Sequence, residues 1–344
     1  MKLTRELGLA AVTAYFPTAR QGAEEAMALG LVDAEDAETL GRPELPVSAD
    51  LAPPEMAVAA GRQALEEAGV DPARVGLLVH SWMHHQGHDI WSAPHYVAHQ
   101  LGAERAQPVG VQQQCNGGVA ALETAAARLL VDPSIDHALV TTGDRFVEPG
   151  WRRWTSDYGI AFGDAATALL LHERDDETDM FTLSGIAIAA APELEEMHRG
   201  DDPFSTDTRP DGEHADLRRR KKAYLARRGI EGFAKAGALK LRQVVTESLA
   251  DAGLEPDDQR IACVALPRLG RKTITDIYAP AVAAITGAPV HDYGHTGHLG
   301  TGDAAASLAE FRQRRLVPAG QYGVVLTAGG GFTWSSIVVR TPER

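Results

Sequence analysis

Apolar positions along the chain follow two alternating patterns, a helical spacing of three to four residues and short continuous apolar runs. Two stretches show this succession clearly, ALEEAGVDPARVGLLVHSW from residue 64 and SLADAGLEPDDQRIACVALP from residue 248. Each predicts an amphipathic helix, a glycine that ends it, a turn with proline, and a buried strand. Their similarity indicates an internal repeat.

A second pair of apolar strands, HALVTTGD and YGVVLTAGG, is separated by nearly the same number of residues and extends the repeat. Each copy also has a strand, a tight loop and an alanine-rich helix, and these loops carry Cys115 in the first copy and His298 in the second. Two βαβ-rich copies related by a pseudo-twofold axis would bring both loops to one central site. We expect an N-terminal half over residues 1–172 and a C-terminal half over residues 236–344.

The region between the halves, residues 173–235, differs in composition. HERDDETD and HRGDDPFSTDTRPDGEHAD are charged and rich in turn-forming residues, which predicts surface loops. LRRRKKAYLARR follows and predicts a basic helix. Its basic residues fit either a solvated helix face or the docking of an acidic carrier protein or a phosphate.

The composition of the chain limits which partners and which cellular location we expect. The chain has 344 residues, is 44% hydrophobic and carries a formal net charge of -14, which argues against nucleic acid or an anionic membrane as the main partner. Two cysteines exclude a disulfide framework and favour a cytoplasmic location. No apolar run is long enough to span a membrane. The first residues outline a signal peptide, but Glu6 interrupts the basic part, and the run ending at Pro17 is more typical of a strand.

Cys115 stands between PVGVQQQ and the helix pattern NGGVAALETAAARLL, which places it on a turn at the start of a helix. Amide groups at a helix N-terminus stabilise a thiolate, the form that a nucleophilic cysteine needs. The alternative is a small buried thiol, and we assign that role to Cys263 in the apolar run IACVAL.

Three motifs resemble the ketosynthase III family of the thiolase superfamily: QQQCNGGVAALETA, FGDAATALLL and AGGGFTWSS. The resemblance implies an α/β protein with the five-layered αβαβα thiolase fold, built from two pseudo-twofold-related halves and usually dimeric. It also implies that Cys115 accepts an acyl group from acyl-CoA or an acyl carrier protein (ACP). The backbone N–H groups of Cys115 and Gly330 would form the oxyanion hole for the thioester carbonyl.

The sequence departs from the family's condensing members at two positions. Their His-Gln-Ala-Asn segment falls on ACVALPRLGR, where Leu266 or Arg268 stands near the histidine position, and their Gly-Asn-Thr-Ser segment aligns with GHLG, which puts His298 in place of asparagine. Asp303 follows at the predicted helix start. Cys115, His298 and Asp303 would then form a nucleophile, a base and an orienting carboxylate, a set that suits acyl transfer to a hydroxyl or an amine.

Two nearby residues have alternative roles. Asp303 is also well placed to cap the helix that begins there. His295 supports the catalytic residues by contacting them, serves as an alternative base, or is simply a hydrogen-bonded loop residue.

Three further groups are candidates for binding. HSWMHHQGHDIWSAPHYVAHQ holds six histidines, but no cysteine or suitably placed glutamate completes a zinc site, so we expect no metal. Beside this segment the family has its active site and dimer contact, which makes Trp82, Trp91 and His95 candidates for a pocket wall or an interface. Arg152 and Arg153 either hold a carboxylate or phosphate of a substrate or are ordinary exposed arginines.

The resemblance extends to ketosynthase III-like acyltransferases of antibiotic biosynthesis. It predicts a homodimeric transferase without a bound cofactor, which moves a short acyl group, of malonyl type if the arginines face the pocket, to a hydroxyl of a small molecule such as a glycosylated natural product. Two alternatives stay open, a starter-unit ketosynthase that condenses with decarboxylation and a non-catalytic partner subunit. The tryptophan and arginine that grip the adenine of coenzyme A in many members have no match near YFPTARQGAEEA.

Overall fold

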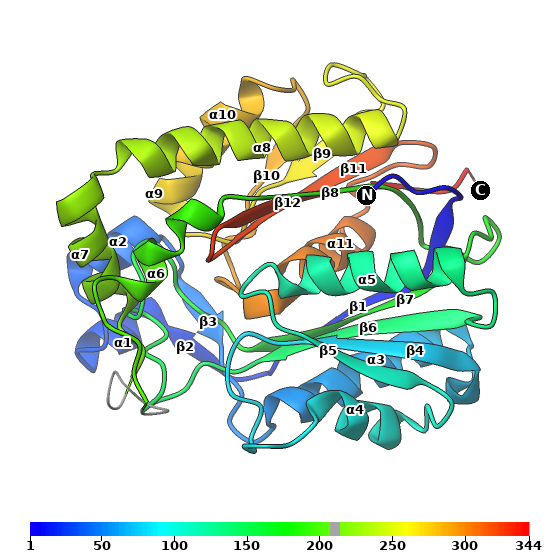
Figure 1. Ribbon diagram of the computed structural model, residues 1–344, viewed down its shortest axis with the longest axis horizontal. Coiled ribbons are helices and arrows are strands. Elements are labelled where there is room, and N and C mark those ends of the chain that lie inside the picture. The colour runs from blue at the N-terminus through cyan, green and yellow to red at the C-terminus, as the bar shows by residue number, and fades with distance from the viewer. Residues whose placement is uncertain (207–213, 344) are drawn as a thin grey trace.

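The computed structural model describes residues 1–206 and 214–343, which form five layers in the order helix, sheet, helix, sheet, helix (Figure 1). The strands that build the two sheet layers and a small separate ribbon are β1 (Leu7–Tyr15), β2 (Arg20–Gly22), β3 (Glu44–Pro46), β4 (Val75–Ser81), β5 (Gln107–Val111), β6 (His137–Asp144), β7 (Ala165–Glu173), β8 (Phe181–Ala190), β9 (Ile261–Ala265), β10 (Val290–His291), β11 (Tyr322–Gly329) and β12 (Thr333–Arg340).

The two sheet layers repeat one topology. The first runs β5-β4-β6-β7-β1 and the second β10-β9-β11-β12-β8. In each, three parallel strands are followed by two antiparallel ones. A short antiparallel pairing of β1 with β8 joins the layers. The internal repeat predicted from the sequence is therefore present as two equivalent half-sheets.

Helices cover both outer faces and fill the space between the sheets. The longer ones are α3 (Pro53–Ala68), α4 (Ala93–Leu101), α5 (Gly117–Val131), α7 (Leu217–Arg228), α8 (Glu231–Asp251) and α11 (Asp303–Gln313). The shorter ones are α1 (Ala23–Ala28), α2 (Ala34–Leu40), α6 (Glu196–Arg199), α9 (Arg271–Thr273) and α10 (Ala279–Ala283), with helical turns at Pro72–Arg74, Pro192–Leu194, Ile274–Tyr278 and Gly300–Gly302. Figure 1 shows α5 and α11 as the central layer, with α3 and α4 on one outer face and α8 on the other.

The predicted helix ends are confirmed. Gly69 ends α3 with φ 64°, and Gly253 follows α8 with φ 69°, a left-handed conformation that favours glycine. β4 and β9 come next along the chain. The N-terminal apolar run forms β1, a buried strand that ends at Tyr15, two residues before the proline.

The connecting region is more structured than its composition suggests. Phe181–Ala190 lies between the two segments predicted as surface loops, and it is β8, a mostly buried strand of the second half-sheet that the sequence analysis did not predict. The predicted basic helix is confirmed as α7. Residues 207–213 of the second predicted loop lie outside the described residues. The boundaries proposed for the halves stay predictions.

Candidate active site

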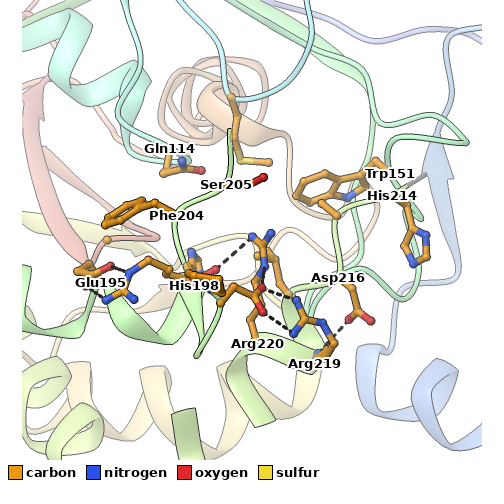
Figure 2. A pocket seen from close by; sticks show the side chains of 17 residues that line it. Gln114, Trp151, Glu195, His198, Phe204, Ser205, His214, Asp216, Arg219 and Arg220 are labelled. Atoms are coloured by element: carbon orange, nitrogen blue, oxygen red, sulfur yellow. Dashed lines mark hydrogen bonds and ion pairs between the residues drawn. The ribbon is translucent and has the colours of Figure 1, made fainter. Parts of the chain in front are cut away.

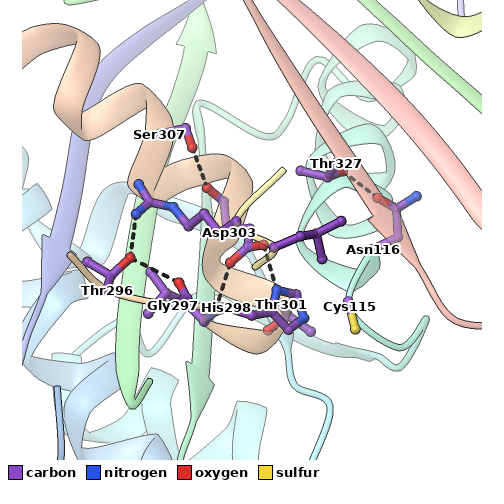
Figure 3. Close-up of polar contacts among 12 residues, drawn as sticks. Cys115, Asn116, Thr296, Gly297, His298, Thr301, Asp303, Ser307 and Thr327 are labelled. Atoms are coloured by element: carbon purple, nitrogen blue, oxygen red, sulfur yellow. Dashed lines mark hydrogen bonds and ion pairs between the residues drawn. The ribbon is translucent and has the colours of Figure 1, made fainter. Parts of the chain in front are cut away.

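Cys115 lies where the sequence predicts it, on the turn between β5 and α5 (Figure 3). The turn is tight, since Gln114 has φ 47°. The side chain of Cys115 is partly exposed, and its Sγ lies 3.3 Å from Sδ of Met83. A thiol at the start of a central helix, still open to a substrate, has the environment of a nucleophile.

Asn116 connects this turn to the second half of the chain through hydrogen bonds. It is fully buried, and its Oδ1 accepts hydrogen bonds from Oγ1 of Thr327 at 2.6 Å and Oγ of Ser335 at 2.7 Å. A Cβ at Gly329 would lie only 2.7 Å from the Asn116 backbone nitrogen. The glycine turn that contains Gly330 is therefore held beside the Cys115 turn, as the oxyanion-hole prediction requires.

The loops of the two copies meet in the central layer. A Cβ at Gly118 would overlap the carbonyl oxygen of Thr301, and one at Gly117 would lie 2.9 Å from Cγ2 of the same threonine. The start of α5 thus packs directly on the turn that precedes α11. This contact confirms that the pseudo-twofold arrangement brings the two loops to one site.

We expect Gly118→Ala to lower the free energy of unfolding by about 1 to 3 kcal/mol, because the backbone of Thr301 must move to admit the methyl group. Denaturant unfolding measures the change. Gly232→Ala is the matched control, since a Cβ there meets nothing within 4 Å and alanine favours the helix α8. Equal stability of the Gly118→Ala variant and wild type would contradict the close packing.

His298 and Asp303 form a buried pair beside Cys115. Nδ1 of His298 donates to Oδ2 of Asp303 at 2.6 Å, and the other carboxylate oxygen accepts from the Leu299 backbone N–H at 2.8 Å. Only 1% of the His298 side chain is exposed. Asp303 is the first residue of α11, but its oxygens bind the loop before the helix, so it orients His298 rather than capping the helix.

The bond to Asp303 leaves Nε2 of His298 as the atom available for proton exchange. This nitrogen is buried, and the Cys115 thiol interacts with the imidazole by charge and by a hydrogen bond. Burial alone lowers the pKa of His298, but the charges of Asp303 and of a Cys115 thiolate outweigh it, and the pKa is raised well above 6.5. Figure 3 shows the imidazole between Asp303 and Cys115.

Asp144, which the sequence analysis missed, links the site to the neighbouring loop. It ends β6 fully buried and accepts hydrogen bonds from the backbone N–H groups of Met83 and His84 and from the N–H and Oγ1 of Thr301. One carboxylate thus holds the loop beside the Cys115 sulfur and the turn before Asp303. A charged residue at the end of the apolar strand HALVTTGD was the signal that could have found it.

His295 lies apart from the pair. Its ring is 59% exposed, and Nε2 lies 3.2 Å from Oε1 of Glu310 on α11. Among the roles left open by the sequence, this contact fits a hydrogen-bonded loop residue. No hydrogen bond joins His295 to Cys115 in the part of the chain that the structure describes.

The two arginines have different environments. Arg153 is buried and donates to Asp164 at 3.1 and 3.2 Å and to the carbonyl of Phe162. It is engaged in an internal ion pair, which corrects its interpretation as a substrate ligand. Arg152 is half exposed, with Glu148 at 3.7 Å, and borders a small cavity of about 370 Å³.

The aromatic candidates near the first loop lie close to the surface. Trp82 stacks on His80 and packs over Gly110. Trp91 is 40% exposed beside the fully exposed Ile90. His95 is exposed and its Nδ1 bonds Ser92 at 2.6 Å. None of the three predicted residues lines the main cleft, so the interface role is the one that their exposure favours.

A cleft of about 1100 Å³ opens onto the Cys115 turn (Figure 2). Met83, Gln114 and Gly331 form its inner wall. Its described outer lining comes from Trp151, from the segment around α6, and from the start of α7 with the residues just before it. His198, against which a Cβ at Gly330 would collide, is part of this wall and was not foreseen from the sequence.

Within the described ranges, no group of three or more histidine, cysteine, aspartate or glutamate side chains could hold a metal ion. None of the described helices is long and apolar enough to cross a membrane.

Comparison with known proteins finds relatives of one kind. Residues 109–187 match the family model of 3-oxoacyl-[acyl-carrier-protein (ACP)] synthase III. The chain is 29% identical to beta-ketoacyl-[acyl-carrier-protein] synthase III of Erythrobacter litoralis over 85% of each chain. It is 24% identical to the protein of the same name from Roseiflexus sp. over 82% of each.

Solved structures of similar proteins have the same fold as this chain. ChlB3, described as an acyltransferase, superimposes with a TM-score of 0.90 at 29% identity over 98% of both chains. The priming beta-ketosynthase of the R1128 polyketide pathway gives a TM-score of 0.77 at 21% identity over 98% of this chain and 97% of its own, a likeness of fold. The expected thiolase fold is confirmed, and both the sequence and the structure of the chain are similar to proteins of the ketosynthase III family.

Proposed function

We propose that this protein is an acyltransferase that moves a short acyl group, through a thioester on Cys115, to a hydroxyl of a small molecule. The observation that carries the proposal is the buried His298–Asp303 pair beside a partly exposed cysteine at a helix start. The similarity to ChlB3, described as an acyltransferase, supports it. The donor is an acyl-CoA or an acyl-ACP, and no bound cofactor takes part.

In the first half-reaction His298 accepts the proton of the Cys115 thiol through Nε2, while Asp303 holds Nδ1–H. The thiolate attacks the thioester carbonyl of the donor. The developing oxyanion is stabilised by the backbone N–H groups of Cys115 and Gly330. The carbon–sulfur bond to the donor then breaks, and the leaving thiolate takes the proton from His298.

The second half-reaction reverses these roles. Once Cys115 is acylated its negative charge is gone, and with it one of the two charges that raise the His298 pKa. The imidazole is then a better match for a neutral base near pH 7. It removes the proton of the acceptor hydroxyl as the oxygen attacks the acyl-enzyme, and it returns that proton to the departing Cys115 sulfur.

This coupling predicts that Cys115→Ala lowers the pKa of His298. Burial still lowers it and Asp303 still raises it, but the thiolate contribution is removed. In wild type the stabilisation from the protonated ring is fully present below pH 6.5 and is lost as the pH rises through the higher folded-state pKa. In the variant that loss moves to lower pH. NMR titration of the imidazole, assigned with His298→Gln, measures the shift, and an unchanged pKa would contradict the coupling.

Decarboxylative condensation is the second candidate, because the curated relatives are named synthases. A malonyl thioester labelled with ¹⁴C in its free carboxyl group separates the two reactions. Transfer leaves the label in an ester product, whereas condensation releases labelled carbon dioxide. We expect label in the ester, and stoichiometric release of carbon dioxide with a new carbon–carbon bond would overturn the proposal.

A homodimer and a cytoplasmic location complete the proposal. Ile90 and Trp91 are large apolar residues exposed on one loop, which suits a subunit contact.

A further inference from the structure

Arg268 lies in the interior of the second half, just after β9. None of its side chain is exposed. Its Nη1 donates to Oγ1 of Thr296 at 2.6 Å, its Nη2 lies 3.4 Å from Oε1 of Glu310, and its guanidinium stacks over the ring of Tyr293 at 4.5 Å. A fully buried arginine needs such partners, because an uncompensated charge there is strongly destabilising.

Glu310 is the second member of this cluster. It is almost completely buried on α11, seven residues after Asp303 on the same helix. Besides Arg268 it meets His295 at 3.2 Å and Arg314 at 3.6 Å. Burial raises the pKa of Glu310, but the hydrogen bonds and charges of His295 and Arg268 outweigh burial and hold the pKa below its usual value.

The partners of Arg268 belong to the two segments that carry the catalytic pair. Thr296 lies on the loop two residues before His298, and its Oγ1 in turn donates to the Gly297 carbonyl at 3.0 Å. Glu310 lies on the helix that begins with Asp303. The one guanidinium therefore connects the loop of the base to the helix of the orienting carboxylate.

We propose that Arg268 is a positioning residue, which holds the His298 loop against α11 so that Nδ1 of His298 meets Asp303 and Nε2 faces Cys115. The inference rests on the proposed function, since it assigns a role relative to the same catalytic pair. A buried ion pair adds little to stability compared with apolar residues of similar size, so fixing the loop is a better reason for this cluster than stability is.

The test uses Thr296→Val and Arg268→Lys. The first removes the acceptor of the Nη1 hydrogen bond and keeps the side-chain shape, and the second keeps the charge but not the planar fork. Arg268→Met, which leaves Glu310 with fewer cations, is added if it folds. Arg74→Met is the control, because Arg74 forms an exposed pair with Asp136 at 3.4 Å.

The readout is the rate of Cys115 alkylation by iodoacetamide from pH 5 to 10, followed by mass spectrometry. This needs no acyl substrate and reports how well His298 holds the thiolate. We expect Thr296→Val and Arg268→Lys to slow alkylation near pH 6.5 about tenfold and to move the profile to higher pH, while Arg74→Met follows wild type. Arg268→Lys should retain more of the rate than Arg268→Met.

Unchanged profiles in folded Thr296→Val and Arg268→Lys would overturn the positioning role and leave the proposed function intact. Another result would contradict the proposed function as well as the positioning role. If wild type itself alkylates with the same profile as its His298→Gln variant, no thiolate–imidazole coupling exists, and both the proposed chemistry and the role of Arg268 in supporting it are wrong.

Discussion

Replacing Cys115 by alanine is expected to abolish acyl-enzyme formation and turnover, because no other described thiol can take its place. Cys263 is buried in β9, and burial raises the pKa of its thiol to about 12. The measurement is the burst of free donor thiol released on mixing enzyme with an acyl thioester, quantified by chromatography. Wild type should release about one thiol per active site before the acceptor is added.

Cys263→Ala is the matched control, since it makes the same substitution at a buried thiol in an apolar strand outside the site. We expect it to keep the burst. A burst that survives Cys115→Ala would contradict the covalent route.

His298→Ala is expected to slow both half-reactions by on the order of a hundredfold or more, because the same imidazole takes a proton from Cys115 and later from the acceptor. Asp303→Asn should have a smaller effect. It keeps an oxygen near the ring but loses the charge that raises the His298 pKa. Single-turnover kinetics of acylation, and of acyl transfer from isolated acyl-enzyme, measure the two steps separately.

His99→Ala serves as the control, because His99 is exposed on α4 and belongs to neither site loop. It should match wild type in both steps. Full turnover in His298→Ala combined with loss of turnover in His295→Ala would show that the base is assigned to the wrong residue.

The sequence predicted those parts of the fold that repeat. Helix periodicity and the glycines at residues 69 and 253 identified α3 and α8, and the match between the two copies placed Cys115 opposite His298. The structure brings those turns together through the contact of Gly118 with Thr301. A helix leaves a clear periodic pattern of apolar residues in the sequence, and a glycine marks its end. These predictions therefore agree with the structure.

β8 was missed because it lies between two charged segments, and composition averaged over the region hides a ten-residue strand. Its burial is decided by its partners β1 and β12, which are distant in sequence.

The sequence also did not predict which polar side chains pair with one another in the interior. Arg153 was predicted to be either a substrate ligand or an exposed arginine, but it is buried and binds Asp164, and nothing in the local pattern of either residue encodes that pairing. The local sequence likewise does not encode the partners of Asp144, which accepts hydrogen bonds from backbone N–H groups of two separate loops. Nor does it encode those of Arg268, whose partners lie on a loop and a helix. A buried charge is explained by where its counter-charge lies in space, which one sequence does not reveal.

The most direct test of the account is intact-protein mass spectrometry of wild type and Cys115→Ala after incubation with a panel of acyl-CoA and acyl-ACP thioesters, followed by a chase with a hydroxyl acceptor. The account predicts one acyl adduct, confined to wild type, with a malonyl group retained intact and lost on the chase as an ester forms. No adduct from any thioester would contradict it and favour a non-catalytic partner subunit. An adduct that loses carbon dioxide and forms a carbon–carbon bond would establish a condensing enzyme instead.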